Sequence, residues 1–285
     1  MYLSHLRLAA PQRAAAAAAA SARGLSTCPD AAAAFARLLH GRRSGAPMDA
    51  ARAVDAPTLR ALVELTARAP SGFNMQPYTV VLLEAAPARA RLAAGAMLGG
   101  GNAARVARAP LVAVFAADLD AMASVEEVQA MEARAGQRPA AYLRGLPTGA
   151  AAFASSQRGC ASGAGAAGAA AAALAGSALG ALTGVPLPPL GVPGIAWAYK
   201  QTALAAMTYL LAAASLGLVA HPLEGLDPAR AARAVGLCGT RFSVPLVVAT
   251  GWPAAGAAAG AAAPPPTPRR TSVFRLNTAA TPFPL

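Results

Sequence analysis

Three short apolar runs constrain the fold of this chain more than any other feature of its sequence. They are "YTVVLLE" at 78–84, "APLVAVFAAD" at 109–118 and "SVPLVVATGWP" at 243–253. A continuous apolar run of this length, rich in β-branched residues and bounded by Pro, Gly or polar residues, is typical of a buried strand. We therefore expect a central sheet built from these runs.

Helical patterns lie between and around the expected strands. In "DAPTLRALVELTARA", Asp55 is placed to cap a helix, Pro57 lies in its first turn, and apolar residues recur at helical spacing. Asp227 and Pro228 predict a second such start. Further helices are expected around "RLAAGAML" at 91–98, over the apolar stretch 199–218 that ends near Gly217, and on the surface at 118–135, which contains Glu126, Glu127 and Glu132.

The first 29 residues have the composition of an organellar transit peptide. They hold Arg7, Arg13 and Arg23, several serines and an alanine run, and they contain no acidic residue. The stretch "ARGLST" at 22–27 is similar to a matrix-processing site. We expect import into mitochondria, with the chloroplast as the alternative, and a folded domain over residues 30–285. A secretory signal and a disordered tail are the rival interpretations.

An Ala- and Gly-rich stretch interrupts the chain at about 145–196. Residues 161–182 are uncharged for long enough to raise the question of a membrane span. Ala and Gly contribute little insertion energy and Leu is sparse, so a membrane association is not favoured. We interpret the stretch as a flexible insertion.

Net charge and scattered ligand residues restrict the classes of partner. The formal charge is +12, but only Lys200 among 24 basic residues is a lysine, which indicates coding bias. No basic run is interleaved with aromatic residues, so nucleic acid is not expected as a partner, whereas anionic ligands remain favoured. Neither a disulfide framework nor a metal site is indicated, because cysteines and histidines are far apart: Cys28, Cys160, Cys238, His5, His40 and His221.

Four polar clusters remain to be explained. They are "GRRSG" at 41–45, "RAPSGFNMQPY" at 68–78, "GGGNAARVARAP" at 99–110 and "PRR" at 268–270. The second holds more hydrogen-bonding side chains than a turn needs for itself, which indicates a bound ligand. Arginine, serine and backbone donors suit a phosphate, and Asn and Gln side chains suit a heteroaromatic ring. Flavin mononucleotide (FMN) has both parts.

The order of these clusters resembles the nitroreductase family of flavin enzymes. "RRS" precedes the first core helix, "PSGFNMQPY" the first strand and "NAARVARAP" the second, while "HPLEGLD" follows a long apolar helix and a basic residue comes late. The resemblance covers most of residues 37–110 and 197–275. Its most specific part is the helix that leads into "PLEGLD".

The resemblance implies a set of FMN-binding residues. The first motif would approach the phosphate and the pyrimidine edge, the second the ribityl chain and ring, the third the pyrimidine side, and the fourth would pack on the ring face near N5. A terminal basic residue would complete the set. In this sequence the matching positions are Arg42, Arg43 and Ser44; Pro70, Ser71, Gly72, Asn74 and Gln76; Asn102 and Arg105; Pro222, Glu224 and Gly225; and Arg269 or Arg270. Relatives commonly carry a second cation where this chain has Ala46.

The family also implies an architecture and a reaction. We expect one α+β domain with a mixed central sheet flanked by helices, in a homodimer whose interface builds two flavin sites. NADH or NADPH would reduce the FMN and leave, and a nitroaromatic or quinone-like small molecule would then take the electrons in a ping-pong mechanism. The alternatives are another flavin reaction on the same fold, such as reductive dehalogenation or flavin fragmentation, and a membrane-associated protein without catalytic activity.

Overall fold

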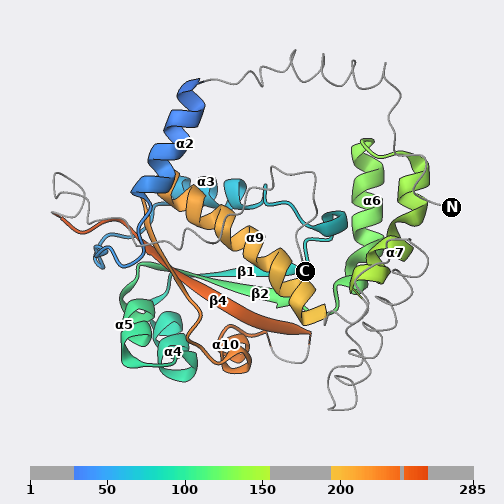
Figure 1. The fold of residues 1–285 in the computed structure, drawn as a ribbon. Helices are drawn as coiled ribbons and strands as arrows, with labels where there is room; N and C mark the ends of the chain where they lie inside the picture. The colour runs from blue at the N-terminus through green and yellow to red at the C-terminus, as the bar shows by residue number, and fades with distance from the viewer. Residues whose placement is uncertain (1–28, 155–193, 238–240, 256–285) are drawn as a thin grey trace, which may run out of the picture.

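The computed structural model describes residues 29–154, 194–237 and 241–255 (Figure 1). The expected transit segment up to residue 28, the uncharged stretch 161–182 and the basic pair Arg269 and Arg270 lie outside these residues. None of the described helices combines the length and the apolar character that crossing a bilayer requires.

A four-stranded sheet forms the centre of the fold. Its strands are β1 (Tyr78–Leu83), β2 (Leu111–Asp118), β3 (Val219–Leu223) and β4 (Phe242–Gly251), in the order β1-β2-β4-β3. The three strands expected from the apolar runs are confirmed as β1, β2 and β4, and the α+β class is confirmed with them. Every residue of β2 is buried, as expected of a strand covered on both faces.

All pairings among the described strands are antiparallel, whereas we expected a mixed sheet. The connection from β1 to β2 explains this for the first pair. It contains two short helices, α4 (Ala86–Ala96) and α5 (Gly100–Arg108), which pack on each other. Leu83 at the end of β1 lies opposite Val112 near the start of β2, so the two helices return the chain to the edge that it left. A single crossover helix would instead have produced a parallel pair.

The sequence did not predict β3. Its residues "VAHPL" include Pro222, which has no N–H to donate and which argues against a central strand. The structure places β3 at the edge of the sheet, where it pairs only with β4 among the described strands. A proline is tolerated at that position because an edge strand has one side free of ladder hydrogen bonds.

Helices cover both faces of the sheet and divide the core in two (Figure 1). Helices α9 (Gly194–Ser215) and α3 (Ala56–Thr66) pack on one face, and α4, α5 and α10 (Pro228–Ala234) on the other. Side chains of β2 alternate between the two cores, as the pleat of a strand requires: Leu111, Ala113 and Phe115 face the first, and Val112, Val114 and Ala116 the second. Phe115 meets Tyr209 of α9 edge to face, with ring centroids 5.5 Å apart.

Local signals correctly identified where two helices begin. Asp55 accepts a hydrogen bond from the Thr58 N–H at 2.9 Å, and Asp227 accepts one from the Arg230 N–H at 2.9 Å. A proline follows each cap in the first turn. Helix α2 (Pro29–Gly41), which comes before them, was not predicted; Figure 1 shows it beside the end of α9.

A third core lies under α6 (Val125–Ala135) and α7 (Ala140–Ala154), beyond the end of β2. Two 3₁₀ turns, Gly72–Asn74 and Ala121–Ser124, border it. The structure corrects two expectations here. Helix α7 continues through residues 145–154, which we had assigned to the insertion, and Glu132, expected on the surface, is only 8% exposed. Neither the acidic residues of α6 nor the Ala- and Gly-rich composition of α7 indicates which side of the helix is buried against the rest of the protein.

We expect Leu146→Ala to destabilise the protein by about 2–5 kcal/mol, because Leu146 is 1% exposed in the third core. Thr148→Ala, on the exposed side of the same helix, should change the unfolding free energy by less than about 0.5 kcal/mol. Urea denaturation of both variants measures the difference. If both substitutions change the unfolding free energy by the same small amount, α7 does not unfold together with the rest of the core.

Candidate functional site

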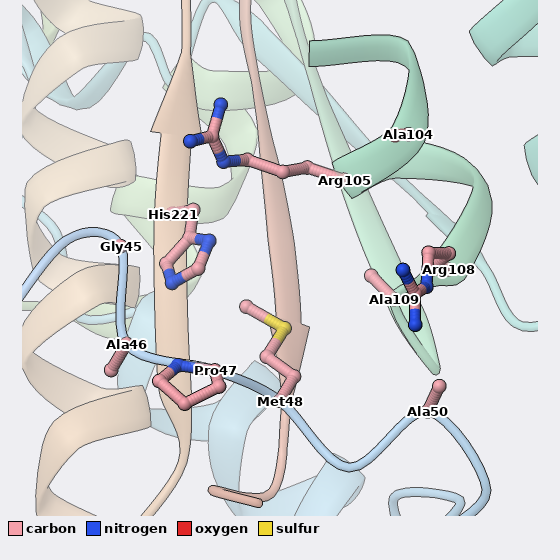
Figure 2. A pocket seen from close by; sticks show the side chains of 10 residues that line it. All are labelled: Gly45, Ala46, Pro47, Met48, Ala50, Ala104, Arg105, Arg108, Ala109 and His221. Atoms are coloured by element: carbon pink, nitrogen blue, oxygen red, sulfur yellow. The ribbon is translucent and has the colours of Figure 1, made fainter. Parts of the chain in front are cut away.

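A pocket of about 290 Å³ lies between α5, the loop after α2, and β3 (Figure 2). It unites three segments that are far apart in the sequence. The residues that line it are Gly45, Ala46, Pro47, Met48, Ala50, Ala104, Arg105, Arg108, Ala109 and His221. All charged side chains in this lining are basic.

The loop after α2 forms one wall of the pocket. Gly45 has φ +95°, a left-handed conformation that favours glycine, and it turns the chain from the "RRS" motif into the pocket. The N–H of Asp49 donates to the Trp252 carbonyl at 2.8 Å, and the N–H of Ala254 donates to the Pro47 carbonyl at 3.0 Å. These bonds fasten the loop to the chain that follows β4.

Helix α5 supplies the positive charge. Arg105 and Arg108 are one turn apart and so lie on the same side of the helix. Arg105 reaches toward the imidazole of His221, while Arg108 lies farther along α5 toward Ala50 (Figure 2). The Arg105 guanidinium is 3.4 Å from Oδ1 of Asn102, which orients the amide of Asn102 beside it.

The segment after β3 approaches α4 and α5 closely at Gly225. The N–H of Leu98 donates to the Gly225 carbonyl at 2.8 Å, and the N–H of Asp227 donates to the Ala96 carbonyl at 2.8 Å. A Cβ added at Gly225 would lie 2.5 Å from Nδ2 of Asn102. Glycine is therefore needed here for close packing, and it brings backbone of the "PLEGLD" segment beside a polar side chain.

His221 is the buried titratable group of the pocket. It is 7% exposed, and its Nε2 atom has no hydrogen-bond partner within the part of the chain that the structure describes. Burial lowers the pKa of His221 below its ordinary value of 6.5, and the charge of Arg105 lowers it further, against an opposing contribution from the nearby Ala46 backbone. The imidazole is therefore neutral at pH 7.

The polar loop at 70–76 lies elsewhere and adopts a strained conformation. Phe73, Asn74 and Gln76 all have positive φ angles, of 56°, 56° and 45°, which non-glycine residues rarely adopt. Its polar groups bond within the protein. The Gly72 N–H donates to Gln201 Oε1 at 2.8 Å, and Asn74 Nδ2 donates to Glu132 Oε1 at 2.7 Å.

Hydrogen bonds inside the loop complete this arrangement. Ser71 Oγ accepts from the Gln76 N–H at 2.9 Å, and Gln76 Nε2 donates to the Asn74 carbonyl at 3.2 Å. Part of the surplus of polar side chains therefore maintains the unusual backbone. Clusters of backbone strain of this kind are characteristic of functional sites.

The pocket and the 70–76 loop lie toward opposite ends of the sheet. His221 of β3 pairs with Ala249 of β4, and Tyr78, which follows the loop, has the same register as Ala117 and Ser243. The two positions are six residue steps apart along β4, from Ser243 to Ala249, which corresponds to about 20 Å. Within one subunit, the two groups of candidate residues do not surround a common cavity.

The remaining candidate residues that the structure describes contact only neighbours in the sequence or lie outside the pocket. Arg42 donates to Ser44 Oγ at 3.2 Å, and Arg43 donates to the His40 carbonyl at 2.7 Å; neither lines the pocket. Pro222 lies within β3, Glu224 is exposed just after it, and Pro70 is exposed before the strained loop. Arg269 and Arg270 lie outside the described residues. The roles of all these residues in cofactor binding stay predictions.

Three of the lining residues that were not candidates from the sequence are His221, Arg108 and Met48. His221 was grouped with scattered histidines although it directly precedes Pro222 of a candidate motif. Arg108 was identifiable, because it follows Arg105 by one helical turn. Met48 carried no signal, since its place in the pocket depends on the bonds that hold its loop to the chain after β4.

A family model described as "Nitroreductase family" matches residues 39–252, which is most of the chain. The chain belongs to the nitroreductase family. The match confirms the resemblance and includes the pocket together with the strained loop.

Individual proteins are similar to the chain in sequence or in fold. A Thermus thermophilus protein named "NADH dehydrogenase" is 29% identical over 197 residues, which cover 69% of this nitroreductase-family chain and 76% of the relative. An Exiguobacterium sibiricum protein described as a nitroreductase, solved in complex with FMN, shares the fold with TM-score 0.60 at 20% identity, covering 85% of this chain and 97% of that one. A Staphylococcus epidermidis protein described as an NAD(P)H:FMN oxidoreductase has TM-score 0.61 at 16% identity, covering 85% and 95%.

The lowered pKa of His221 predicts a pH-dependent stability. Between the folded pKa and the unfolded value near 6.5, the unfolded chain binds a proton that the folded protein does not. The unfolding free energy should therefore fall as the pH drops below about 6.5, by no more than about 1.4 kcal/mol per pH unit.

His221→Gln and His221→Met should each remove this component. The quantity to compare is the change in unfolding free energy between pH 7.5 and pH 5, measured by urea denaturation, because either substitution can also shift stability at all pH values. If the wild type and both variants show the same change over this range, folding does not lower the pKa of His221.

Proposed function

We propose that this protein is an FMN-dependent oxidoreductase that takes electrons from NADH or NADPH and passes them to a nitroaromatic or quinone-like acceptor. The observation that carries the proposal is the pocket, where segments of three motifs with a predicted role in flavin binding meet around Arg105. The family assignment supports it. So do the FMN-bound neighbour and the relatives described as acting on NADH or NAD(P)H.

Arg105 in the pocket lining, with Asn102 and Gly225 beside it, fits one end of a flavin. Arg105 offers guanidinium donors, Asn102 has both an amide donor and an acceptor, and Gly225 allows backbone to come close to the same place. The pyrimidine edge of a flavin carries alternating hydrogen-bond donors and acceptors, so it needs both donors and acceptors from the protein. The pocket is at the small end of the range typical for ligand sites, about 300–1,000 Å³, so it suits this edge rather than the whole cofactor.

When bound, FMN supplies the chemistry, by accepting a hydride from the nicotinamide and passing two electrons to the acceptor. The protein then has to bind the cofactor and to polarise its ring. Arg105, which is exposed in the described structure, would place a positive charge where negative charge develops on reduction, and such a cation stabilises that charge most effectively once the bound cofactor excludes water. Arg42 and Arg43 are the proposed partners of the phosphate, together with Arg269 or Arg270.

We further propose that a homodimer completes the site. The strained loop at 70–76 is about 20 Å from the pocket in the same subunit, so a second copy would have to bring its own loop to the cofactor. Helices α2, α3 and α9 pack together and expose large apolar side chains that an interface would cover. These are Phe35, Leu39, Val63, Leu65, Leu204 and Met207.

The first test is a visible absorbance spectrum with FMN titration. Purified protein should bind FMN, and NADH or NADPH should bleach its absorbance. Arg105→Ala should weaken FMN binding by about tenfold to a hundredfold, the scale of a lost charge-assisted hydrogen bond of about 1.5–3 kcal/mol. Arg91→Ala, which removes the same charge from an exposed position on α4, should leave binding unchanged. A wild type that does not bind FMN would refute the proposed function.

A second test uses the close approach at Gly225. Gly225→Ala places a Cβ 2.5 Å from the Asn102 amide and must displace it, so FMN binding should weaken about threefold to tenfold, as expected for one neutral hydrogen bond. In an Asn102→Ala background the same change should matter less than about twofold. Gly95→Ala is the matched control, because nothing lies within 4 Å of its added Cβ. Equal effects of Gly225→Ala in both backgrounds would show that it acts independently of Asn102.

A further inference from the structure

His221 is a buried polar side chain whose role neither the fold nor the proposed function explains. It lines the pocket, it is 7% exposed, and its Nε2 has no hydrogen-bond partner among the described residues. An unpaired buried polar atom destabilises the folded state, and native proteins retain such atoms rarely. A buried, unpaired nitrogen at a pocket wall points to a partner that comes with the ligand.

The surroundings of His221 determine how its charge can change. Side chains alternate along β3, so His221 points to the same side of the sheet as Leu223, toward α5. From α5 it faces Arg105, with Arg108 farther along the pocket. The loop after α2 contributes the uncharged residues 45–48, and the neighbouring position on β4 is Ala249.

Among the residues that the structure describes, no acidic side chain lines the pocket. With only positive charge nearby, and with most of the side chain removed from water, the free protein holds the imidazole in its neutral form. A negative charge in the pocket would reverse this balance, because it would attract both Arg105 and a protonated imidazole. The Ala46 backbone beside the imidazole favours its protonated form, but the uncharged Ala46 side chain cannot itself balance a negative charge in the pocket.

We infer that His221 is a binding residue that takes up one proton when the pocket gains a negative charge and releases it when that charge leaves. The inference rests on the proposed function, in which the source of that charge is the reduction of bound FMN. NAD(P)H delivers a hydride, which is two electrons and one proton, so the site gains one unit of negative charge. The imidazole then binds a second proton from solvent, and the charge of the site is restored.

The return step balances in the same way. A quinone-like acceptor takes two electrons and two protons to become a hydroquinone. One proton moves with the electrons as hydride and solvent supplies the second proton to the acceptor, while the proton on His221 goes back to solvent as the negative charge disappears. Each turnover therefore leaves the imidazole neutral. Between the two half-reactions, protonated His221 stabilises the negative charge of the reduced cofactor.

Redox titration of the FMN-loaded protein against reference dyes between pH 5.5 and pH 8.5 tests the inference. The dependence of the midpoint potential on pH gives the number of protons bound for each two electrons. The wild type should bind two protons per electron pair over part of this range, and His221→Gln and His221→Met should bind one. His40→Gln, which changes an exposed histidine on α2 outside the pocket, should behave as the wild type.

A second measurement identifies the site of the extra proton. The NMR signal of the His221 ring Cε1–H should report a neutral imidazole at pH 7 in the free protein and with oxidised FMN, and a protonated imidazole after anaerobic reduction. The measurement uses the wild type, so it stays decisive even if both His221 variants fail to fold.

The outcomes separate the two proposals. If FMN binds and is reduced but the wild type and the His221 variants bind the same number of protons, or if the imidazole stays neutral after reduction, the inference about His221 is wrong and the proposed function stands. If the protein does not bind FMN at any concentration, the proposed function is wrong and the inference fails with it.

Discussion

The burial of β2 on both faces is the constraint on which the rest of this structure depends. All eight residues of the strand are buried, and its side chains alternate between two separate cores. An apolar strand of this kind is stable only when a layer of helices covers each side of the sheet. Helix α9 with α3 provides one layer, and α4, α5 and α10 provide the other.

The same layers position the pocket. Helix α5 has to pack on the sheet beside the start of β2, and β4 brings the edge strand β3 to the same end. Arg105 and His221 therefore meet although more than a hundred residues separate them in the chain. The strained loop lies at the other end, where its polar groups hold three residues at positive φ through bonds to Gln201, to Glu132 and to one another.

Local signals predicted much of the fold, and their failures have physical reasons. Apolar runs identified β1, β2 and β4, and capping residues identified the starts of α3 and α10, because both signals act within a few residues. The edge strand β3 was missed, since its proline disfavours a strand wherever both sides are paired and only the position at the edge permits it. The end of α7 was assigned to an insertion because alanine and glycine do not indicate burial by themselves. The order of the polar motifs correctly indicated the nitroreductase family.

The sequence by itself determined the family, the expected cofactor chemistry, and the presence of a buried sheet with helices between its strands. These properties follow from residue types and from spacings along the chain. Only the tertiary structure decided that His221 lies unpaired beside Arg105, that Glu132 is buried against Asn74, and that the two groups of candidate residues lie at opposite ends of the sheet. Burial, electrostatic environment and the meeting of side chains depend on atoms from distant parts of the chain, and no local pattern contains that information.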